Sequence, residues 1–495
     1  MRTPALVLAV TLALGCSDSA KVYRLTPKTA APAPSAAAVD PEPWRNTRPS
    51  PGKAGEVRFP APKVEELSSG LKLYVLPRPA GLVRVRLVVR HGASSVPQGK
   101  AGLAALTARM LTEGTQKRNS LALAQAAESL GATLESDAER DASYVELSAF
   151  PEDLDRALEL LAEVVMRPAF DAKEFERVRA EWLDGLVAER QSPDRLAALA
   201  GLRVLNGPVH GAPVGGGVSD VKSLTLKDLT AFHAHAYTPS SAALFLVGNV
   251  SEAVAREKVQ RHFGAWTKKP VGKTASVPLP EAPAARRVVL FDRPGAVQTA
   301  VFVAQRFPAR LAPGYEVRQV LGGVVGGLFT SRLNLNLREK HGYTYGASGH
   351  PIATRDWGAF LVSTSVRTDA TAPSLEQIFA ELDRARNPAL GAPIEAAEVQ
   401  RAKADLLHTL GAKLEHTTRV LDTASDLFVD GLASDYFEKY PGVLAPIAAR
   451  DVAESAVALT PDRMIAVLVG DASAVRPALE ALGFKPEAGN EALLD

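Results

Sequence analysis

The chain has 495 residues, of which 46% are hydrophobic and 23% are charged, and its formal net charge at pH 7 is +2. These proportions are typical of a globular protein, and the length is ample to bury more than one core. The small net charge argues against a strong electrostatic preference for nucleic acid, so we expect no nucleic-acid partner.

The first sixteen residues have the pattern of an export signal. Arg2 precedes an apolar run, residues 5–14, that is too short to span a membrane. The run is followed by Gly15 and by Cys16, the only cysteine of the chain. A cysteine after a small residue at this place resembles a bacterial lipobox, although Ala13 stands where leucine is usual. We therefore expect residues 1–16 to be a lipoprotein signal peptide; an ordinary signal peptide with a coincidental cysteine is the alternative.

In the lipobox reading, acyl chains on Cys16 anchor the protein to a bacterial membrane more firmly than a single chain could. The following segment, residues 17–62, is rich in proline and alanine and poor in large apolar residues, which predicts an extended tether. We expect a location in the cell envelope, with the globular part in the periplasm. Because no second cysteine is available for an intrachain disulfide, stability there must come from packing.

Two strands separated by an Arg-Pro turn begin the globular part, because residues 71–89 alternate apolar and polar side chains on both sides of Arg78-Pro79. Residues 288–304 repeat this order around Arg293-Pro294. The sequence Thr-Pro followed by an apolar run ending in glycine also occurs twice, as residues 238–248 and 460–470. These repeats predict two homologous halves.

Helical runs at residues 154–165 and 399–410 alternate with the strands, which favours an α+β fold in each half. A segment rich in proline and alanine separates the halves and is typical of a linker. We therefore divide the globular part into an N-terminal domain at 63–270, a linker at 271–286, a C-terminal domain at 287–485 and a tail at 486–495.

The segment 102–115 carries the most informative motif. Leu103, Leu106 and Met110 recur at steps of three and four residues, so an amphipathic helix is predicted, and Ala105 and Arg109 share one of its faces. The surrounding frame, Gly-x-Ala before these positions and Met-x-x-x-Gly-Thr after them, resembles the pitrilysin/insulinase family of zinc metallopeptidases. In that family, the zinc motif His-x-x-Glu-His lies inside this frame.

The resemblance implies that the metal site has been lost. The two histidine positions hold Ala105 and Arg109, and the general-base position holds Ala108. Alanine offers no lone pair and a guanidinium is a cation with donors only, so neither can bind zinc. The family's third ligand, a glutamate on a later helix, falls at Gly185. If this alignment is off by a few residues, the family's ligand corresponds instead to one of three nearby carboxylates, Glu181, Asp184 or Glu189.

The family fold is two α/β sandwich-like halves joined by a linker, which together form one half of a clamshell peptidase chamber. In the family, a substrate peptide adds to an edge strand of the first half through backbone hydrogen bonds. The matching substrate-binding residues here are Thr133, Leu134, Glu135 and Ser136. Acidic side chains at this place are also what an ordinary protected edge strand carries.

The second half keeps another part of the family site. In family members an arginine and a later tyrosine hydrogen-bond the substrate near the scissile bond, and Arg338 and Tyr345 match their spacing. Two donors that converge on a developing oxyanion can lower a barrier by a few kcal/mol. Tyr343 is the competing tyrosine. Without the resemblance, Arg338 and Glu339 read as a surface pair and Tyr345 as a core residue.

A group of glycines precedes this segment and resembles a flexible, substrate-facing loop of the family. Close helix packing explains such glycines equally well. The four residues are Gly322, Gly323, Gly326 and Gly327.

The histidines offer no substitute metal site. His233 and His235 are the only close pair, and two-residue spacing places them on opposite sides of a helix, with no carboxylate one turn away. We expect both to be structural or surface residues. His210 matches a family loop. We find no nucleophile elbow, P-loop or dinucleotide-binding fingerprint.

Three functional hypotheses follow. In the first, the protein is the non-catalytic subunit of a heterodimeric zinc peptidase: it binds extended peptides and donates Arg338 and Tyr345 to the zinc site of a partner, as unequal subunits do in some bacterial members and in the mitochondrial processing peptidase. No cofactor is then expected in this chain, and zinc is expected in the partner. In the second, the protein is a membrane-tethered peptide-binding or scaffold lipoprotein. In the third, it is a peptidase with unrecognised ligands.

Overall fold

The computed structural model describes residues 42, 47, 57–267, 277–490 and 493–494. Cys16, the expected signal peptide, most of the expected tether and residues 271–276 of the expected linker lie outside the described residues. Two compact units are distinguished, Met1–Glu56 and Val57–Asp495, and the description below concerns the second. In the described part of the chain no helix is both long enough and apolar enough to span a membrane.

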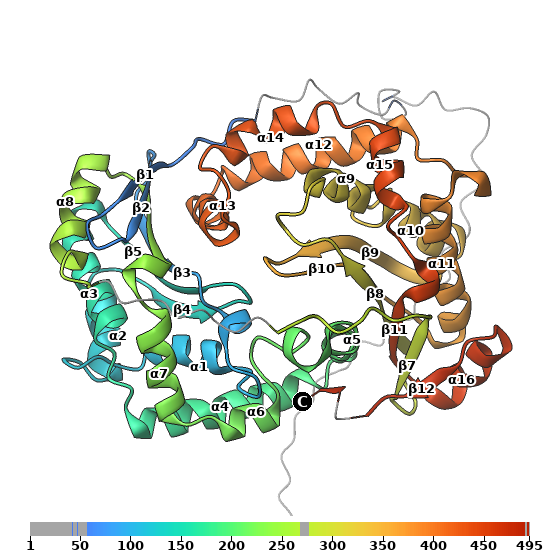
Figure 1. Ribbon diagram of the computed structural model, residues 1–495, viewed down its shortest axis with the longest axis horizontal. Helices are drawn as coiled ribbons and strands as arrows, with labels where there is room; N and C mark the ends of the chain where they lie inside the picture. The colour runs from blue at the N-terminus through green and yellow to red at the C-terminus, as the bar shows by residue number, and fades with distance from the viewer. Residues whose placement is uncertain (1–41, 43–46, 48–56, 268–276, 491–492, 495) are drawn as a thin grey trace, which may run out of the picture. The chain divides into compact units, whose positions relative to one another are not determined.

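The second unit contains two six-stranded sheets (Figure 1). The first has the order β1-β2-β6-β3-β5-β4 and the second β12-β7-β11-β8-β10-β9. The strands of the first sheet are β1 Lys63–Glu66, β2 Lys72–Pro77, β3 Val83–Val89, β4 Leu134–Ala138, β5 Ser143–Ala149 and β6 Ala242–Gly248. Those of the second are β7 Arg287–Asp292, β8 Gln298–Phe307, β9 Thr344–Ala353, β10 Gly358–Arg367, β11 Ile465–Gly470 and β12 Pro486–Ala488.

The two sheets share one topology over five strands each, β2-β6-β3-β5-β4 and β7-β11-β8-β10-β9. β2 pairs with β6 in parallel, as β7 does with β11, and the remaining pairs of these strands are antiparallel in both sheets. Val85 in the first sheet lies opposite both Leu246 and Leu147, so the alternating apolar side chains of three strands form one face. The prediction of an α+β fold with two homologous halves is confirmed. β12 places part of the expected tail at the edge of the second sheet.

Helices follow the strands in the same order in each half. In the N-terminal half they are α1 Leu103–Leu111, α2 Ser120–Glu128, α3 Leu154–Met166, α4 Ala172–Glu189, α5 Pro193–His210, α6 Val218–Ser223, α7 Leu226–Ala236 and α8 Glu252–Phe263. In the C-terminal half they are α9 Tyr315–Val325, α10 Arg332–Asn334, α11 Thr371–Arg386, α12 Ala396–Lys413, α13 Thr417–Asp430, α14 Tyr436–Leu444, α15 Ala449–Ala456 and α16 Ala472–Ala481. The helical runs predicted at 154–165 and 399–410 correspond to α3 and α12.

The halves exchange one helix each. α5 packs against β8 and β11 of the second sheet, and α13 packs against β3 and β6 of the first. Gly201 on α5 approaches Phe302 so closely that an added Cβ would lie 2.2 Å from its ring, while Phe428 on α13 contacts Tyr74 with ring centroids 6.3 Å apart. Each sheet is therefore covered on one face by helices of its own half and on the other by a helix of the opposite half.

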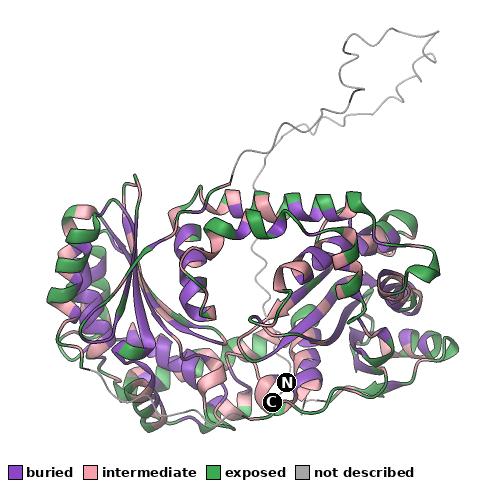
Figure 2. Ribbon diagram, turned by 45° about the horizontal axis from the view of Figure 1, so that its top comes forward, coloured by how far each residue is buried: buried purple, intermediate pink, exposed green. Residues whose placement is uncertain are grey.

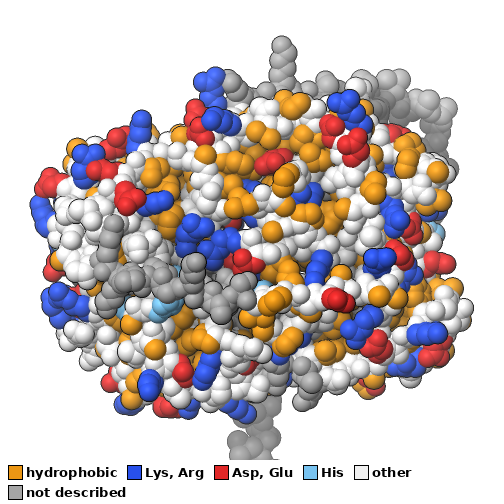
Figure 3. All heavy atoms as spheres, viewed as in Figure 1, with side chains coloured by type: hydrophobic (Ala, Val, Ile, Leu, Met, Phe, Trp, Pro, Cys, Tyr) orange, Lys and Arg blue, Asp and Glu red, His pale blue; other side chains and the backbone are white. Residues whose placement is uncertain are grey.

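The cores follow from this arrangement. Figure 2 shows the strands of both sheets as buried, whereas the helices around them are buried only on their inner sides. Phe59, at the end of the segment expected to be a tether, is 1% exposed and packs on Phe437 of α14 with ring centroids 5.5 Å apart. On the face that Figure 3 shows, basic and acidic side chains are interspersed.

Candidate functional site

Residues of the family frame at 102–115 form α1 and the turns at its two ends. Gly102 caps α1 with a φ of 87°, and a Cβ there would lie 2.6 Å from the Gly215 carbonyl oxygen, so only glycine fits. Leu106 and Met110 are buried in the N-terminal core. After the helix, the Thr115 hydroxyl donates to the buried Glu163 carboxylate. These motif residues have structural roles that do not require a metal.

The positions that the resemblance assigns to the family's zinc ligands differ in their surroundings. Ala105 and Ala108 are buried, whereas the Arg109 side chain is 38% exposed. The Arg109 guanidinium forms an ion pair with Glu113, one helical turn later, and donates to the Thr112 hydroxyl at 3.0 Å. Glu113 is 7% exposed and also pairs with Arg177 of α4. Arg109 therefore neutralises a buried carboxylate at a place where the family motif has a histidine.

Gly185 lies beside Arg109 in space. Both line a cavity of about 360 Å³ between α1 and α4, together with Trp182, whose indole N–H donates to the Gly215 carbonyl at 2.9 Å. The two alternative carboxylates that face this cavity are engaged by arginines: Glu181 by Arg177 and Glu189 by Arg195. Asp184 is not among its lining residues.

These residues do not fit a zinc ion. The cavity offers a guanidinium, a glycine and carboxylates already bound to arginines, and no neutral imidazole. Over the described ranges, no group of three or more His, Cys, Asp or Glu residues is placed to hold a metal.

Replacing Gly185 with alanine is expected to stabilise the protein by about 1 kcal/mol. Gly185 lies inside α4, and a Cβ there meets nothing within 4 Å, so alanine improves helix propensity without a clash. The thermal unfolding midpoint checks this. Gly326→Ala is the matched comparison, because its Cβ would lie 2.3 Å from the Gly349 amide nitrogen and should destabilise the protein. A lowered midpoint for Gly185→Ala contradicts the prediction.

The predicted substrate strand is β4, the outermost strand of the first sheet. Glu135 and Ser136 line a cavity of about 240 Å³ whose opposite wall is α13. Thr133 and Leu134 do not line it; the Thr133 hydroxyl lies 3.3 Å from that of Ser148. The cavity thus lies between α13 and the face of the first sheet that β3, β5 and the edge strand β4 form.

This cavity is rich in carboxylates. Among the described residues that line it, the one cation is Arg86, which is bound by Glu146 at 2.5 Å and by Asp422 at 2.7 Å. Asp426 is open to the cavity but surrounded by protein, and this burial, together with the nearby Asp430, raises its pKa to about 7. The surroundings of β4 therefore disfavour an anionic ligand.

Arg338 and Tyr345 lie at the surface of the C-terminal half. Arg338 is in a single π-helical turn, Leu335–Lys340, where its guanidinium stacks over the Phe329 ring at 4.0 Å and lies 3.5 Å from Glu339. Tyr345, the second residue of β9, is 91% exposed. Tyr343 instead stacks on His341, with ring centroids 4.9 Å apart. Tyr345 is thus more accessible than Tyr343 to a second molecule.

The glycines before this segment serve close packing. A Cβ on Gly322 would lie 2.4 Å from Pro351 of β9, and one on Gly323 would lie 2.7 Å from Ala402 of α12. Gly326 forms an isolated antiparallel β-bridge with Gly349. A Cβ on Gly327 would lie 3.2 Å from the Cα of Gly323 in α9. Three of these glycines let α9 approach its neighbours, which supports the packing explanation over the loop.

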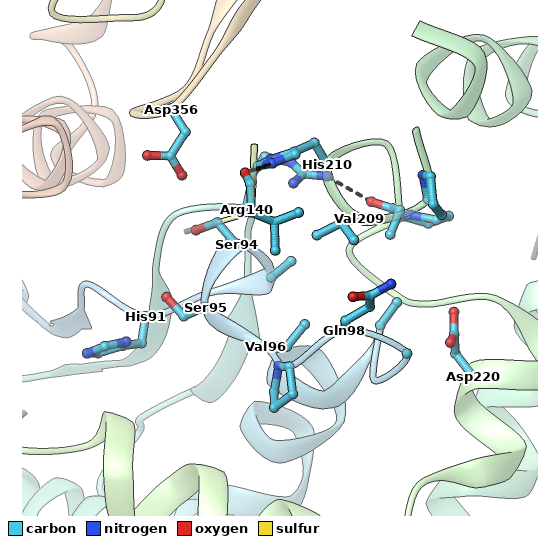
Figure 4. Close-up of a pocket in the computed structure, with 18 of the residues that line it drawn as sticks. His91, Ser94, Ser95, Val96, Gln98, Arg140, Val209, His210, Asp220 and Asp356 are labelled. Carbon is cyan, nitrogen blue, oxygen red and sulfur yellow. Dashed lines mark hydrogen bonds between the residues drawn. The ribbon is translucent and has the colours of Figure 1, made fainter. Parts of the chain in front are cut away.

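The histidines make structural contacts. The His233 ring Nε2 lies 2.9 Å from the Val165 carbonyl oxygen, and His235 meets His91 edge to face at 5.4 Å. His210 Nε2 lies 2.7 Å from the Val277 carbonyl oxygen. His210 also lines a cavity that the sequence did not reveal, because its walls come from both halves of the chain (Figure 4).

Comparisons with known proteins agree with the fold. A family model described as insulinase (peptidase family M16) matches residues 77–198, and one described as peptidase M16 inactive domain matches residues 223–406. A solved peptidase M16 inactive domain from Pseudomonas fluorescens superimposes with a TM-score of 0.75 at 25% identity, covering 83% of this chain and 98% of the other. A Helicobacter pylori protease has the same fold at a TM-score of 0.74 and 18% identity, covering 83% and 99%.

Relatives in sequence include both peptidases and a non-peptidase. An uncharacterised zinc protease of Mycobacterium tuberculosis (strain ATCC 25618 / H37Rv) is 28% identical over 61% of this chain and 69% of its own length. The non-peptidase homologue YmxG of Helicobacter pylori is 26% identical over 53% and 60%. The beta subunit of the Bos taurus mitochondrial-processing peptidase is 25% identical over 45% and 46%.

Proposed function

Because the chain belongs to the insulinase (peptidase M16) family, we propose that it is a non-catalytic subunit that binds peptides and completes the active site of a zinc-bearing family partner. One observation carries the proposal. The zinc ligand positions hold Ala105, Arg109 and Gly185, while Arg338 and the exposed Tyr345 keep the spacing of the family's donor pair. Such a chain can polarise a substrate but cannot activate water with a metal.

The proposal assigns zinc to the partner and none to this chain. In the proposed complex, the partner supplies the metal and this chain supplies the hydrogen-bond donors. A relative named as a subunit of the mitochondrial-processing peptidase and a relative named as a non-peptidase homologue both support it.

The substrate in this proposal is an extended peptide that pairs with β4 through backbone hydrogen bonds. The edge position of β4 and the cavity along Glu135 and Ser136 support this assignment. Lipidation of Cys16, with the globular part in the periplasm, belongs to the same proposal and rests on the sequence alone.

A membrane-tethered peptide-binding or scaffold protein is the second candidate function. The same cavity beside β4 favours it, because peptide binding does not require a donor pair or a partner. The two candidates differ in one requirement: only the first needs a zinc-bearing subunit.

Native affinity purification from detergent-extracted membranes tests the choice, with mass spectrometry of bound proteins and zinc analysis of the complex. A stoichiometric partner with an intact His-x-x-Glu-His motif and about one zinc per pair is the expected result. Recovery of a metal-free protein without such a partner overturns the subunit proposal and favours the tethered binding protein. Zinc bound to this chain alone contradicts both.

A further inference from the structure

A cavity of about 410 Å³ lies between the two halves, away from β4 and from the α1–α4 cavity (Figure 4). The N-terminal half contributes Arg140 and most residues of 90–101, and the end of α5 with the loop after it contributes most residues of 208–213. The C-terminal half contributes Arg355 and Asp356, at the turn between β9 and β10. A ligand in this cavity would touch both halves at once.

The lining has more cationic than anionic side chains. The arginines are Arg90, Arg140, Arg203 and Arg355, and the carboxylates are Asp220 and Asp356. A third carboxylate, Asp141, lies behind the lining: its Oδ2 accepts the Arg355 backbone N–H at 2.9 Å, and its Oδ1 is 3.7 Å from Arg355 Nε. A fourth carboxylate, Asp430 of α13, also acts on Arg90 and Arg355, but Arg310 pairs with it at 2.9 Å, so cations remain in excess.

Two of these arginines, Arg90 and Arg355, repel each other. Burial, followed by the charge of Arg355, lowers the pKa of Arg90 below its usual value. Arg140 is stacked over Trp357 at 5.4 Å and donates to the Ala212 carbonyl at 2.8 Å, so its guanidinium is held in place. An anion between these groups would relieve the repulsion.

Several polar atoms at the cavity have no hydrogen-bond partner among the described residues. They include the His91 ring Nδ1, the Ser94 hydroxyl and the Nε atoms of Arg90 and Arg355. His91 is 7% exposed, and burial together with His235 and both arginines lowers its pKa to about 4, so its imidazole is neutral at pH 7. Buried donors without partners are costly, so ligand oxygen atoms brought within reach of these side chains would stabilise them.

We propose that this cavity binds a small oxyanion, a carboxylate or phosphate group, between Arg90 and Arg140 of the N-terminal half and Arg355 of the C-terminal half. Planar guanidinium groups suit both, because each presents paired N–H donors to two oxygen atoms. The source is either the C-terminal carboxylate of a peptide or a free ion. The proposal does not depend on a partner subunit or on the roles of Arg338 and Tyr345.

Calorimetric titration of the purified full chain at pH 7 tests the proposal, with inorganic phosphate as one probe and a short peptide with a free C-terminus as the other. The same peptide with a C-terminal amide is the matched ligand control. We expect at least one oxyanion to bind, at least tenfold more weakly in Arg355→Gln and in Arg140→Gln. Arg286→Gln is the control variant, because Arg286 is also stacked on an aromatic ring, Phe379 at 3.8 Å, but lies outside the cavity.

Each outcome decides something. Binding of the free-acid peptide but not of phosphate identifies a peptide terminus as the ligand, and binding of phosphate alone identifies a free ion. Binding of neither probe overturns the site, as does equal binding of the amide peptide or an equal loss in Arg286→Gln. If Arg355→Gln fails to fold, as judged by circular dichroism, Ser94→Ala replaces it, with a smaller loss of affinity expected.

Discussion

Arg338→Ala and Tyr345→Phe are each expected to lower the kcat of the reconstituted pair by about 10²-fold, without weakening its assembly. Tyr345 is exposed and the Arg338 side chain is 34% exposed, so in the proposed complex both are accessible to a substrate held by the second subunit. Removing one donor to a developing oxyanion typically costs this much. The measurement is peptide hydrolysis by the partner with the wild-type or variant chain, with complex formation followed by analytical ultracentrifugation.

Two matched variants sharpen the result. Arg367→Ala removes an exposed arginine of the same half that pairs with Asp369, and we expect normal turnover. Tyr343→Phe tests the competing tyrosine, which stacks on His341, and we also expect normal turnover there. Wild-type kcat in the double variant of Arg338 and Tyr345 would show that the pair has no catalytic role.

Local patterns in the sequence predicted the helices and strands that carry the candidate site. The steps between Leu103, Leu106 and Met110 predicted α1, and the family frame placed Gly185 at a position that the structure brings next to Arg109. Both inferences depend on spacing along one or two helices. Such spacing is visible in a single sequence because helical geometry is fixed.

Contacts between the halves could not be predicted in this way. α5 packs on the sheet of the C-terminal half and α13 on the sheet of the N-terminal half, and no local pattern in the sequence indicates this. Arg90, Arg140 and Arg355 meet at one cavity because the N-terminal half contacts the turn between β9 and β10 of the C-terminal half. The glycines before Arg338 were ambiguous for a related reason, because their neighbours Pro351 and Ala402 are distant in sequence.

The second large effect is expected at Glu113. Replacing both Arg109 and Arg177 with alanine should lower the free energy of unfolding by about 3 kcal/mol or more. Glu113 is nearly buried, and these two guanidinium groups neutralise it. An uncompensated buried carboxylate costs about this much. Arg109→Ala alone should cost less, because Arg177 remains. Urea unfolding followed by circular dichroism measures the differences.

Adding Glu113→Gln to the double variant provides the control. Without a charge to bury, the neutral side chain should recover more than half of the lost stability. If Glu113→Gln recovers nothing, the arginines stabilise the protein by packing rather than by charge.

The Arg109–Glu113 ion pair also affects any attempt to restore a zinc site. Arg109→His would supply one imidazole but remove a partner of Glu113, while Ala105 and Gly185 would still offer no ligand. Arg109→His alone therefore costs stability before any zinc affinity is gained.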